Sequence, residues 1–211
     1  VPRRLSGCPY GSKMRKGGNN TMVSRKILSL PRLCQRAGIG LVVGTVLAGS
    51  AVAQDASHPV IAGYGAIQPA VDVSNPPDPS LRYRVVFEVT RTASDNAQIN
   101  PAFDRVARFV NLLAASGVHP PRGDIIIVIH GPATTSILSD AAYQARFHQA
   151  NPNTRLIEEL QKAGVIIHVC SYALAGAKIE KAAVAKDVSI DLAAMVTLAT
   201  LQLKGWALIA G

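Results

Sequence analysis

The chain has 211 residues, of which 22 are Lys or Arg and 13 are Asp or Glu, so its formal net charge is +9. Residues 1–53 hold nine of the basic residues and no acidic one, and residues 54–211 are therefore formally neutral. This neutral remainder has no stripe of basic and aromatic residues, which argues against nucleic-acid binding. A hydrophobic fraction of 48% excludes a disordered or collagen-like chain.

Residues 22–53 have the order of a secretory signal peptide. A basic segment comes first, an uncharged apolar run begins at Ile39, and an Ala-Val-Ala cleavage motif ends at Ala53. We expect cleavage between Ala53 and Gln54 and export to a periplasmic or extracellular location, with no membrane attachment after cleavage. A retained membrane anchor is the alternative, but the run is shorter than the about 20 apolar residues that span a bilayer.

Residues 1–21 are basic and Gly-rich, show no hydrophobic periodicity, and are interpreted as an upstream start that was assigned too early. Cys8 and Cys34 would leave with the leader. Cys170 then has no partner within the chain and belongs to no disulfide framework. Such a cysteine is buried in the core, paired between chains, or kept reactive.

The next segment, residues 54–80, is rich in Pro, Gly, Asn and Asp, and its irregular pattern predicts an extended N-terminal arm over the surface of the domain. A single domain is expected over residues 81–211. Its first strand is predicted over residues 82–90, which include β-branched and aromatic residues. A helix then begins at Pro101, has apolar residues at helical spacing, and ends at Gly117.

Two later stretches are typical of strands that are buried on both faces. Residues 124–130 contain five consecutive β-branched aliphatic residues, and residues 165–170 are again mostly β-branched. Strands of this kind occur mainly in parallel sheets that are covered by helices.

Helical patterns separate and follow these strands. Helices are predicted over residues 135–148, directly after Cys170, and over 191–203, with a last short strand at 205–209. A further helix is capped by residues 151–154 and runs through Leu156, Ile157, Leu160 and Ala163 to Gly164. Strands that alternate with helices predict a three-layer open α/β sandwich with a mostly parallel sheet of four or five strands.

In such a sheet, ligands bind beyond the carboxyl ends of the strands. His130 ends one buried strand and Cys170 ends the other, so the two side chains meet in one crevice if these strands are neighbours. His168 lies two residues before Cys170 and therefore on the same face of its strand. A following helix N-terminus and a nearby imidazolium both favour the reactive thiolate. Cys170, His130 and His168 are therefore the candidate catalytic residues.

Structural roles explain the same residues. Cys is often a buried core residue, His168 suits a hydrogen-bonded place within its strand, and His130 suits a cap of the following loop. A His/His/Cys zinc site has suitable ligand types, but no short-spaced pair supports it beyond His168 and Cys170. For a Cys–His hydrolase the chain shows no oxyanion signature, and the orienting acid would be Asp187 or Asp191. The sequence implies no cofactor, and no metal ligands are predicted.

The order and spacing of several motifs resemble the DsrE/DsrF-like family, in particular its exported single-domain members. The similarity covers about residues 82–209. The residues that carry it are Arg105-Val106-Ala107-Arg108, Asn111-Leu112-Leu113, Gly117-Val118, Val128-Ile129-His130-Gly131-Pro132-Ala133, Asn151-Pro152-Asn153, Leu156-Ile157, Ala163-Gly164-Val165, Val169-Cys170, Leu201-Gln202 and Gly205 to Ile209.

The resemblance implies an α/β fold that assembles into homo-oligomers, either trimers or hexamers. For sulfur-relay members it also implies a cysteine at the end of a strand that carries sulfur as a persulfide, and Cys170 falls on this position. A sulfur donor or acceptor protein would then be a partner. The ligand pocket beside the thiol is predicted to contain Gly131, Asn153, Ser171 and Tyr172, the last two standing where exported relatives are expected to have Gly-Gln.

Two functions of different classes follow from these residues. The first is sulfur handling, as a sulfurtransferase or sulfur carrier, in which Cys170 accepts and passes on sulfane sulfur while His130 or His168 favours its thiolate. The alternative is a non-catalytic oligomeric binding module whose pocket near His130, Cys170 and Tyr172 holds a small ligand or a metal.

Overall fold

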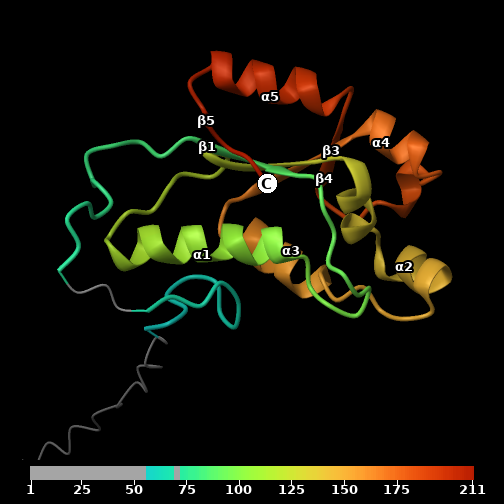
Figure 1. Cartoon of the computed structure of the whole chain (residues 1–211), viewed down its shortest axis with the longest axis horizontal. Coiled ribbons are helices and arrows are strands. Elements are labelled where there is room, and N and C mark those ends of the chain that lie inside the picture. The colour runs from blue at the N-terminus through green and yellow to red at the C-terminus, as the bar shows by residue number, and fades with distance from the viewer. Residues whose placement is uncertain (1–55, 69–71) are drawn as a thin grey trace, which may run out of the picture. The chain divides into compact units, whose positions relative to one another are not determined.

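The domain is built on a sheet of five strands in the order β4-β3-β2-β1-β5 (Figure 1). The computed structural model describes residues 56–68 and 72–211, so the predicted leader and its cleavage site at Ala53 and Gln54 lie outside the described residues. Every neighbouring pair of strands runs parallel, which confirms the predicted α/β class. The strands are β1 Val85–Val89, β2 Ile125–Ile129, β3 Ile166–Cys170, β4 Val188–Asp191 and β5 Ala207–Ile209.

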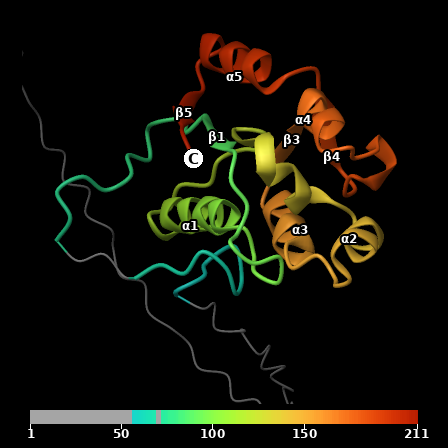
Figure 2. The ribbon, with the colours of Figure 1, turned by 45° about the vertical axis from the view of Figure 1, so that its right-hand side comes forward.

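Helices cover both faces of the sheet. The ribbon views show α1 and α3 on one face and α5 on the other (Figures 1 and 2). The helices are α1 Pro101–Ala115, α2 Asp140–Phe147, α3 Thr154–Lys162, α4 Ser171–Gly176 and α5 Ala194–Leu203, with short 3-10 segments η1 Gly131–Ile137 and η2 Lys181–Ala183. The predicted sandwich of sheet and helices is thus confirmed.

The hydrophobic clusters on the two faces of the sheet differ in size. β2 contributes to both, since all five of its residues are buried and successive residues point to opposite faces. Its first, third and fifth residues pack with α1 and α3 in the large cluster. Its second and fourth residues pack in the small cluster below α5, which also contains Cys170.

The segment predicted as one helix over residues 135–148 is divided in the structure. The backbone of Leu138 is extended and separates η1 from α2. Ser139 then caps α2, because its hydroxyl accepts a hydrogen bond from the backbone N–H of Ala142 at 3.3 Å. A serine in this position competes with a continuous helix.

The start of the last predicted helix is wrong. Asp191, assigned to a helix over residues 191–203, is the last residue of β4, and α5 begins only at Ala194. β4 is a short edge strand without fully buried residues, so it lacks the continuous apolar run that marks β2. Its pairing with β3 depends on tertiary structure and adds the fifth strand.

Residues 56–68 of the N-terminal arm pack against α1. Ile61 is fully buried in the large cluster. The side-chain oxygen of Asn111 accepts hydrogen bonds from the backbone N–H groups of Val60 and Ile61, at 3.1 and 2.9 Å. Gly65 has a φ of +59° and lies so close to the backbone of α1 that a Cβ atom would collide with it. The arm is therefore part of the folded domain.

Among the helices of the described residues, none has the length and apolar character needed to cross a membrane.

Candidate functional site

Cys170 lies at the carboxyl end of β3, where the chain turns into α4. Its side chain points toward α5 and is only 6% exposed. Among the described residues it is a free cysteine, and nothing hydrogen-bonds its thiol. The thiol lines a pocket of about 540 Å³ that opens between the end of the sheet and the beginning of α5.

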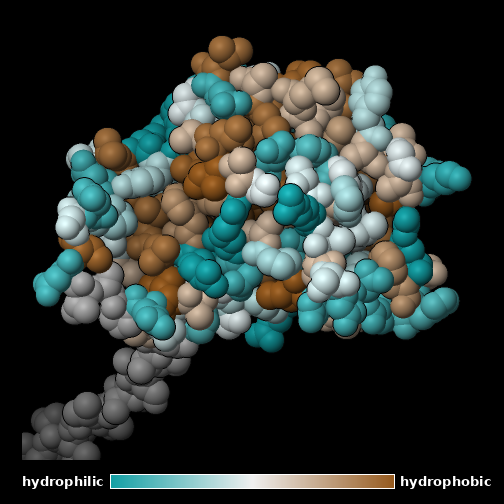
Figure 3. All heavy atoms as spheres, in the orientation of Figure 1, coloured by the Kyte–Doolittle hydropathy of each residue, from teal (hydrophilic) through white to brown (hydrophobic). Residues whose placement is uncertain are grey.

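The wall of this pocket is mostly apolar. Its apolar part comes from α4 and from the beginning of α5. The residues are Tyr172 of α4, Leu192 and Ala193 just before α5, and Ala194, Met195, Val196 and Leu198 in the first turns of α5. The polar groups in the wall are Glu88, His130 and Cys170. In Figure 3, hydrophobic side chains lie along the upper edge of the molecule, where α5 runs. The site is thus an apolar pocket with one thiol and one pair of ionisable side chains.

His130 and Glu88 form that pair. β1 and β2 are parallel neighbours, and the backbone N–H of His130 donates to the carbonyl of Val89 at 3.0 Å. This places Nε2 of His130 2.9 Å from Oε1 of Glu88. The two side chains therefore form a hydrogen-bonded pair in the wall of the pocket.

Gly131 is adjacent to the pocket but does not line it. It has a φ of +59° and lets the chain turn from β2 into η1. A Cβ atom here would lie 3.3 Å from the carbonyl oxygen of Thr90, so the glycine serves the turn that presents His130.

His168 is placed differently from His130. It shares a strand face with Cys170, as predicted, yet it is not among the residues that line the pocket. Its Nδ1 lies 2.9 Å from Oδ2 and 3.0 Å from Oδ1 of Asp191 on β4. Oδ2 of Asp191 also accepts a hydrogen bond from Thr197 of α5 at 2.6 Å. Asp191, one of the two acids considered for an orienting role, therefore contacts His168, and it connects β4 to α5.

Asn153, which the sequence places in the ligand pocket, lies outside it. The side chain is 2% exposed and sits just before α3. Its Oδ1 accepts a hydrogen bond from the backbone N–H of Asn100 at 2.6 Å, and its Nδ2 donates to Oδ1 of Asn151 at 3.0 Å. A buried amide with these partners joins the start of α1 to the start of α3, which is a structural role.

The two residues that follow the cysteine take different positions. Ser171 does not line the pocket, because its hydroxyl donates to the carbonyl of Leu192 at 2.7 Å and so joins α4 to the segment before α5. Tyr172 does line the pocket and is 71% exposed, which places it at the open side. The structure therefore brings together Cys170, His130 and Tyr172 from the predicted set.

Sequence reasoning missed Glu88 and the apolar wall of α5. A signal for Glu88 was present, since it is an acidic residue within an otherwise apolar strand and one residue before its carboxyl end. The wall gives no such signal, because the apolar residues of α5 look like those of any core helix.

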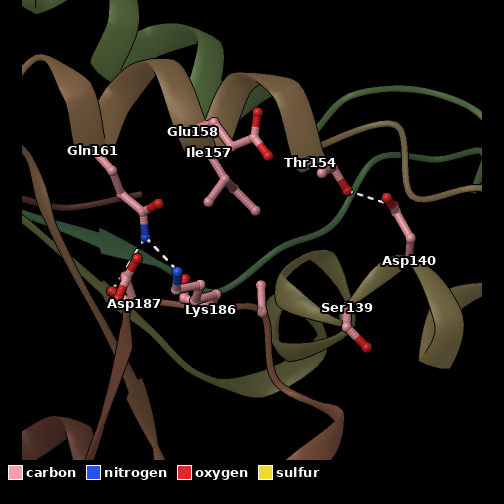
Figure 4. A pocket seen from close by; sticks show the side chains of 9 residues that line it. Ser139, Asp140, Thr154, Ile157, Glu158, Gln161, Lys186 and Asp187 are labelled. Atoms are coloured by element: carbon pink, nitrogen blue, oxygen red, sulfur yellow. Dashed lines mark hydrogen bonds between the residues drawn. The ribbon is translucent and has the colours of Figure 1, made fainter.

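A second pocket, of about 390 Å³, lies beside α3 and the loop before β4 (Figure 4). Carboxylates of Asp140, Glu158 and Asp187 line it. Gln161 spans it by donating to the backbone carbonyls of Lys186 and Asp187, at 3.2 and 3.1 Å. Asp187, one of the two acids considered for an orienting role, lines this pocket, whereas Cys170, His130 and His168 do not. The acidic groups of the pocket do not form a metal cluster. Throughout the described part of the chain, in fact, no group of three or more His, Cys, Asp or Glu side chains could hold a metal ion.

Over the described residues, the chain forms a parallel α/β domain with a buried cysteine at the carboxyl end of strand β3. The chain belongs to the DsrE/DsrF-like family, whose model matches residues 83–210. This confirms the resemblance seen in the sequence.

Two solved structures are similar to the chain. The first is MTH1491 from Methanobacterium thermoautotrophicum, a protein of unknown function, with 19% sequence identity and a TM-score of 0.47, covering 61% of this chain and 99% of that one. The second is the ychN protein from E. coli, with 17% identity and a TM-score of 0.44, covering 61% of this chain and 99% of that one. No curated protein matches the chain.

Proposed function

We propose that the protein handles sulfur by carrying it as a persulfide on Cys170. The observation that carries the proposal is the position of this thiol: it is free, lies at the carboxyl end of a central strand, and lines a pocket shared with His130. Ligand sites of parallel α/β sheets lie at this edge. Two further parts of the proposal rest on the sequence, namely export, on residues 22–53, and homo-oligomeric assembly, on the family resemblance.

The transfer proceeds by two exchanges at sulfur. The Cys170 thiolate attacks the outer sulfur of a donor persulfide R–S–SH, a new S–S bond forms to Sγ, and the donor's S–S bond breaks as its electron pair leaves with RS⁻. An acceptor thiolate then attacks the outer sulfur on Cys170 and releases the Cys170 thiolate. Neither exchange needs an external oxidant or reductant, because sulfane sulfur only changes its partner.

His130 and Glu88 assist the first exchange in this proposal. A protonated imidazole in the pocket stabilises the thiolate, and the Glu88 carboxylate 2.9 Å away stabilises the protonated imidazole. Cys170 itself is only 6% exposed, so little water contacts the thiol.

Mass spectrometry of the purified protein tests the proposal. After incubation with inorganic polysulfide, the peptide that contains Cys170 should gain the mass of one or more sulfur atoms, and a reductant should remove the gain. Peptide mapping separates this signal from Cys8 and Cys34, and Cys170→Ser is the matched control. A Cys170 peptide that stays unmodified in the folded protein, together with slow alkylation of the same thiol, would overturn the proposal and favour the binding module.

A further inference from the structure

The Cys170 pocket contains no cationic side chain apart from the imidazole of His130. Its lining residues include no Lys and no Arg, and the single carboxylate is that of Glu88. Glu88 is the anionic side chain of the lining, and the Cys170 thiolate of the reacting state adds a second negative charge. A donor with negatively charged groups beside its sulfur finds no compensating charge here, and burying such groups without partners is unfavourable.

The remaining lining residues offer apolar surface to a ligand. Leu192, Met195 and Val196 are apolar, lie along the beginning of α5, and stay largely exposed. Met195 is 78% exposed and Tyr172 is 71% exposed, so these two side chains are placed to contact a ligand that enters from solvent. Flexible methionine and flat tyrosine side chains suit contact with an aliphatic or aromatic group.

The volume of the pocket also indicates a small organic molecule. At about 540 Å³ it falls within the range of about 300–1,000 Å³ that is usual for small-molecule sites. The thiol is its innermost reactive group, since Cys170 is only 6% exposed. A donor must therefore place its own body against the α5 wall while its sulfane sulfur reaches Sγ.

We propose that the pocket selects low-molecular-weight persulfides whose organic body is uncharged and apolar. This inference rests on the proposed function and names its substrate class. The exchange is the one written above, with R an alkyl or aryl-alkyl group, and the leaving RS⁻ departs with the donor's electron pair. Donors whose organic body carries carboxylates react more slowly because these charges lack partners in the pocket.

Two donors with the same reacting group test the selectivity. Benzyl persulfide has an apolar uncharged body, and glutathione persulfide has a charged body. Each donor is generated in place at equal concentration, and the rate at which the Cys170 peptide gains one sulfur is measured. This rate is divided by the rate at which the same donor transfers sulfur to the free thiol of N-acetylcysteine, which corrects for the donor's intrinsic reactivity. We expect the normalised rate for benzyl persulfide to be about tenfold higher, the gain expected from burying part of one aromatic ring.

Two lysine variants on α5 distinguish the effect of a cation in the pocket wall from the effect of a cation elsewhere on the same helix. Met195→Lys places a cation in the wall. It should reduce the preference for benzyl persulfide several-fold, because sulfur transfer from glutathione persulfide to Cys170 becomes faster. Leu203→Lys makes the same change at a residue that is 89% exposed on the same helix but outside the pocket, and should leave the preference unchanged. Both positions are exposed, so both variants should fold.

The outcomes distinguish this inference from the function on which it rests. If glutathione persulfide reacts as fast as benzyl persulfide after normalisation, or if both lysine variants change the preference equally, the selectivity is overturned while persulfide formation stands. If neither donor adds sulfur to Cys170, persulfide chemistry at this site is overturned, and the substrate class with it.

Discussion

The side chain of His168 on β3 contacts that of Asp191 on the neighbouring edge strand β4, with Nδ1 of His168 2.9 Å from Oδ2 of Asp191. The same carboxylate oxygen accepts the hydroxyl hydrogen of Thr197, so three elements, β3, β4 and α5, are joined by one carboxylate. α5 contains no charged residue and no side-chain cap at its start. Apolar packing alone would therefore allow it several rotations, and the contact through Thr197 selects the one that forms the wall of the Cys170 pocket.

Thr197→Val should loosen this wall. The variant keeps the shape of the side chain but removes one hydrogen bond to a carboxylate, which we expect to lower the free energy of unfolding by about 1–3 kcal/mol. Alkylation of Cys170 in the native state should become faster, because the thiol is buried by the wall. Thr200→Val, an exposed threonine on the same helix, is the control, and equal effects from the two variants would contradict the role given to Asp191.

His130→Gln should slow the reaction of Cys170 with iodoacetamide. Glutamine can still donate a hydrogen bond to Glu88 but cannot carry a positive charge, so the pocket loses the side chain that is proposed to stabilise the thiolate. Iodoacetamide rates measured across pH check this, with exposed His119→Gln as the control. Identical profiles for wild type and His130→Gln would remove His130 from the chemistry.

Asn153→Ala should act on stability and not on the thiol. The substitution leaves the backbone N–H of Asn100 without its acceptor in a buried place, which costs about 1–3 kcal/mol of unfolding free energy. The Cys170 alkylation rate of the folded variant should equal that of wild type. Chemical denaturation and alkylation kinetics measure the two effects, and Asn75→Ala serves as an exposed control. A changed alkylation rate without lost stability would return Asn153 to the ligand pocket.

Tyr143 should make the fold sensitive to alkaline pH. Burial raises the pKa of its hydroxyl above the ordinary value, since the side chain is 3% exposed and donates to the carbonyl of Asn96 at 2.7 Å. The folded state then holds this proton more tightly than the unfolded state, so stability should be constant below about pH 10 and fall as the pH rises further.

The phenylalanine variant isolates this effect. Tyr143→Phe should be less stable at neutral pH by about 1 kcal/mol, for the lost hydrogen bond, and should lose less stability than wild type on the alkaline side. Denaturation curves over an alkaline pH series measure both differences. Tyr172→Phe, at an exposed ring, should follow the wild-type curve. Parallel alkaline losses in wild type and Tyr143→Phe would assign the sensitivity to another group.

Much of the fold was predictable because the pattern that encodes it is local. An unbroken β-branched run in β2 indicates burial on both faces, and this in turn indicates a parallel sheet between helices. The boundary of β4 was not predictable, because a partly buried edge strand lacks that pattern and forms only by pairing with β3. The motifs that resemble the DsrE/DsrF-like family led to the membership that the family model confirms.

The hydrophobic pattern alone predicts that Cys170 ends one strand and that His130 directly follows another, because strand ends follow from local hydrophobicity and turn residues. It also predicts burial on both faces for both strands, which holds for β2 but not for β3, where Ile166 and His168 are half-buried. What surrounds Cys170 and His130 depends on the tertiary structure. Strand order makes β2 and β3 neighbours, pairs His130 with Glu88, and directs His168 to Asp191 and away from the pocket. The order of the strands and the placement of α5 depend on contacts between segments far apart in the chain, and a local hydrophobic pattern does not encode such contacts.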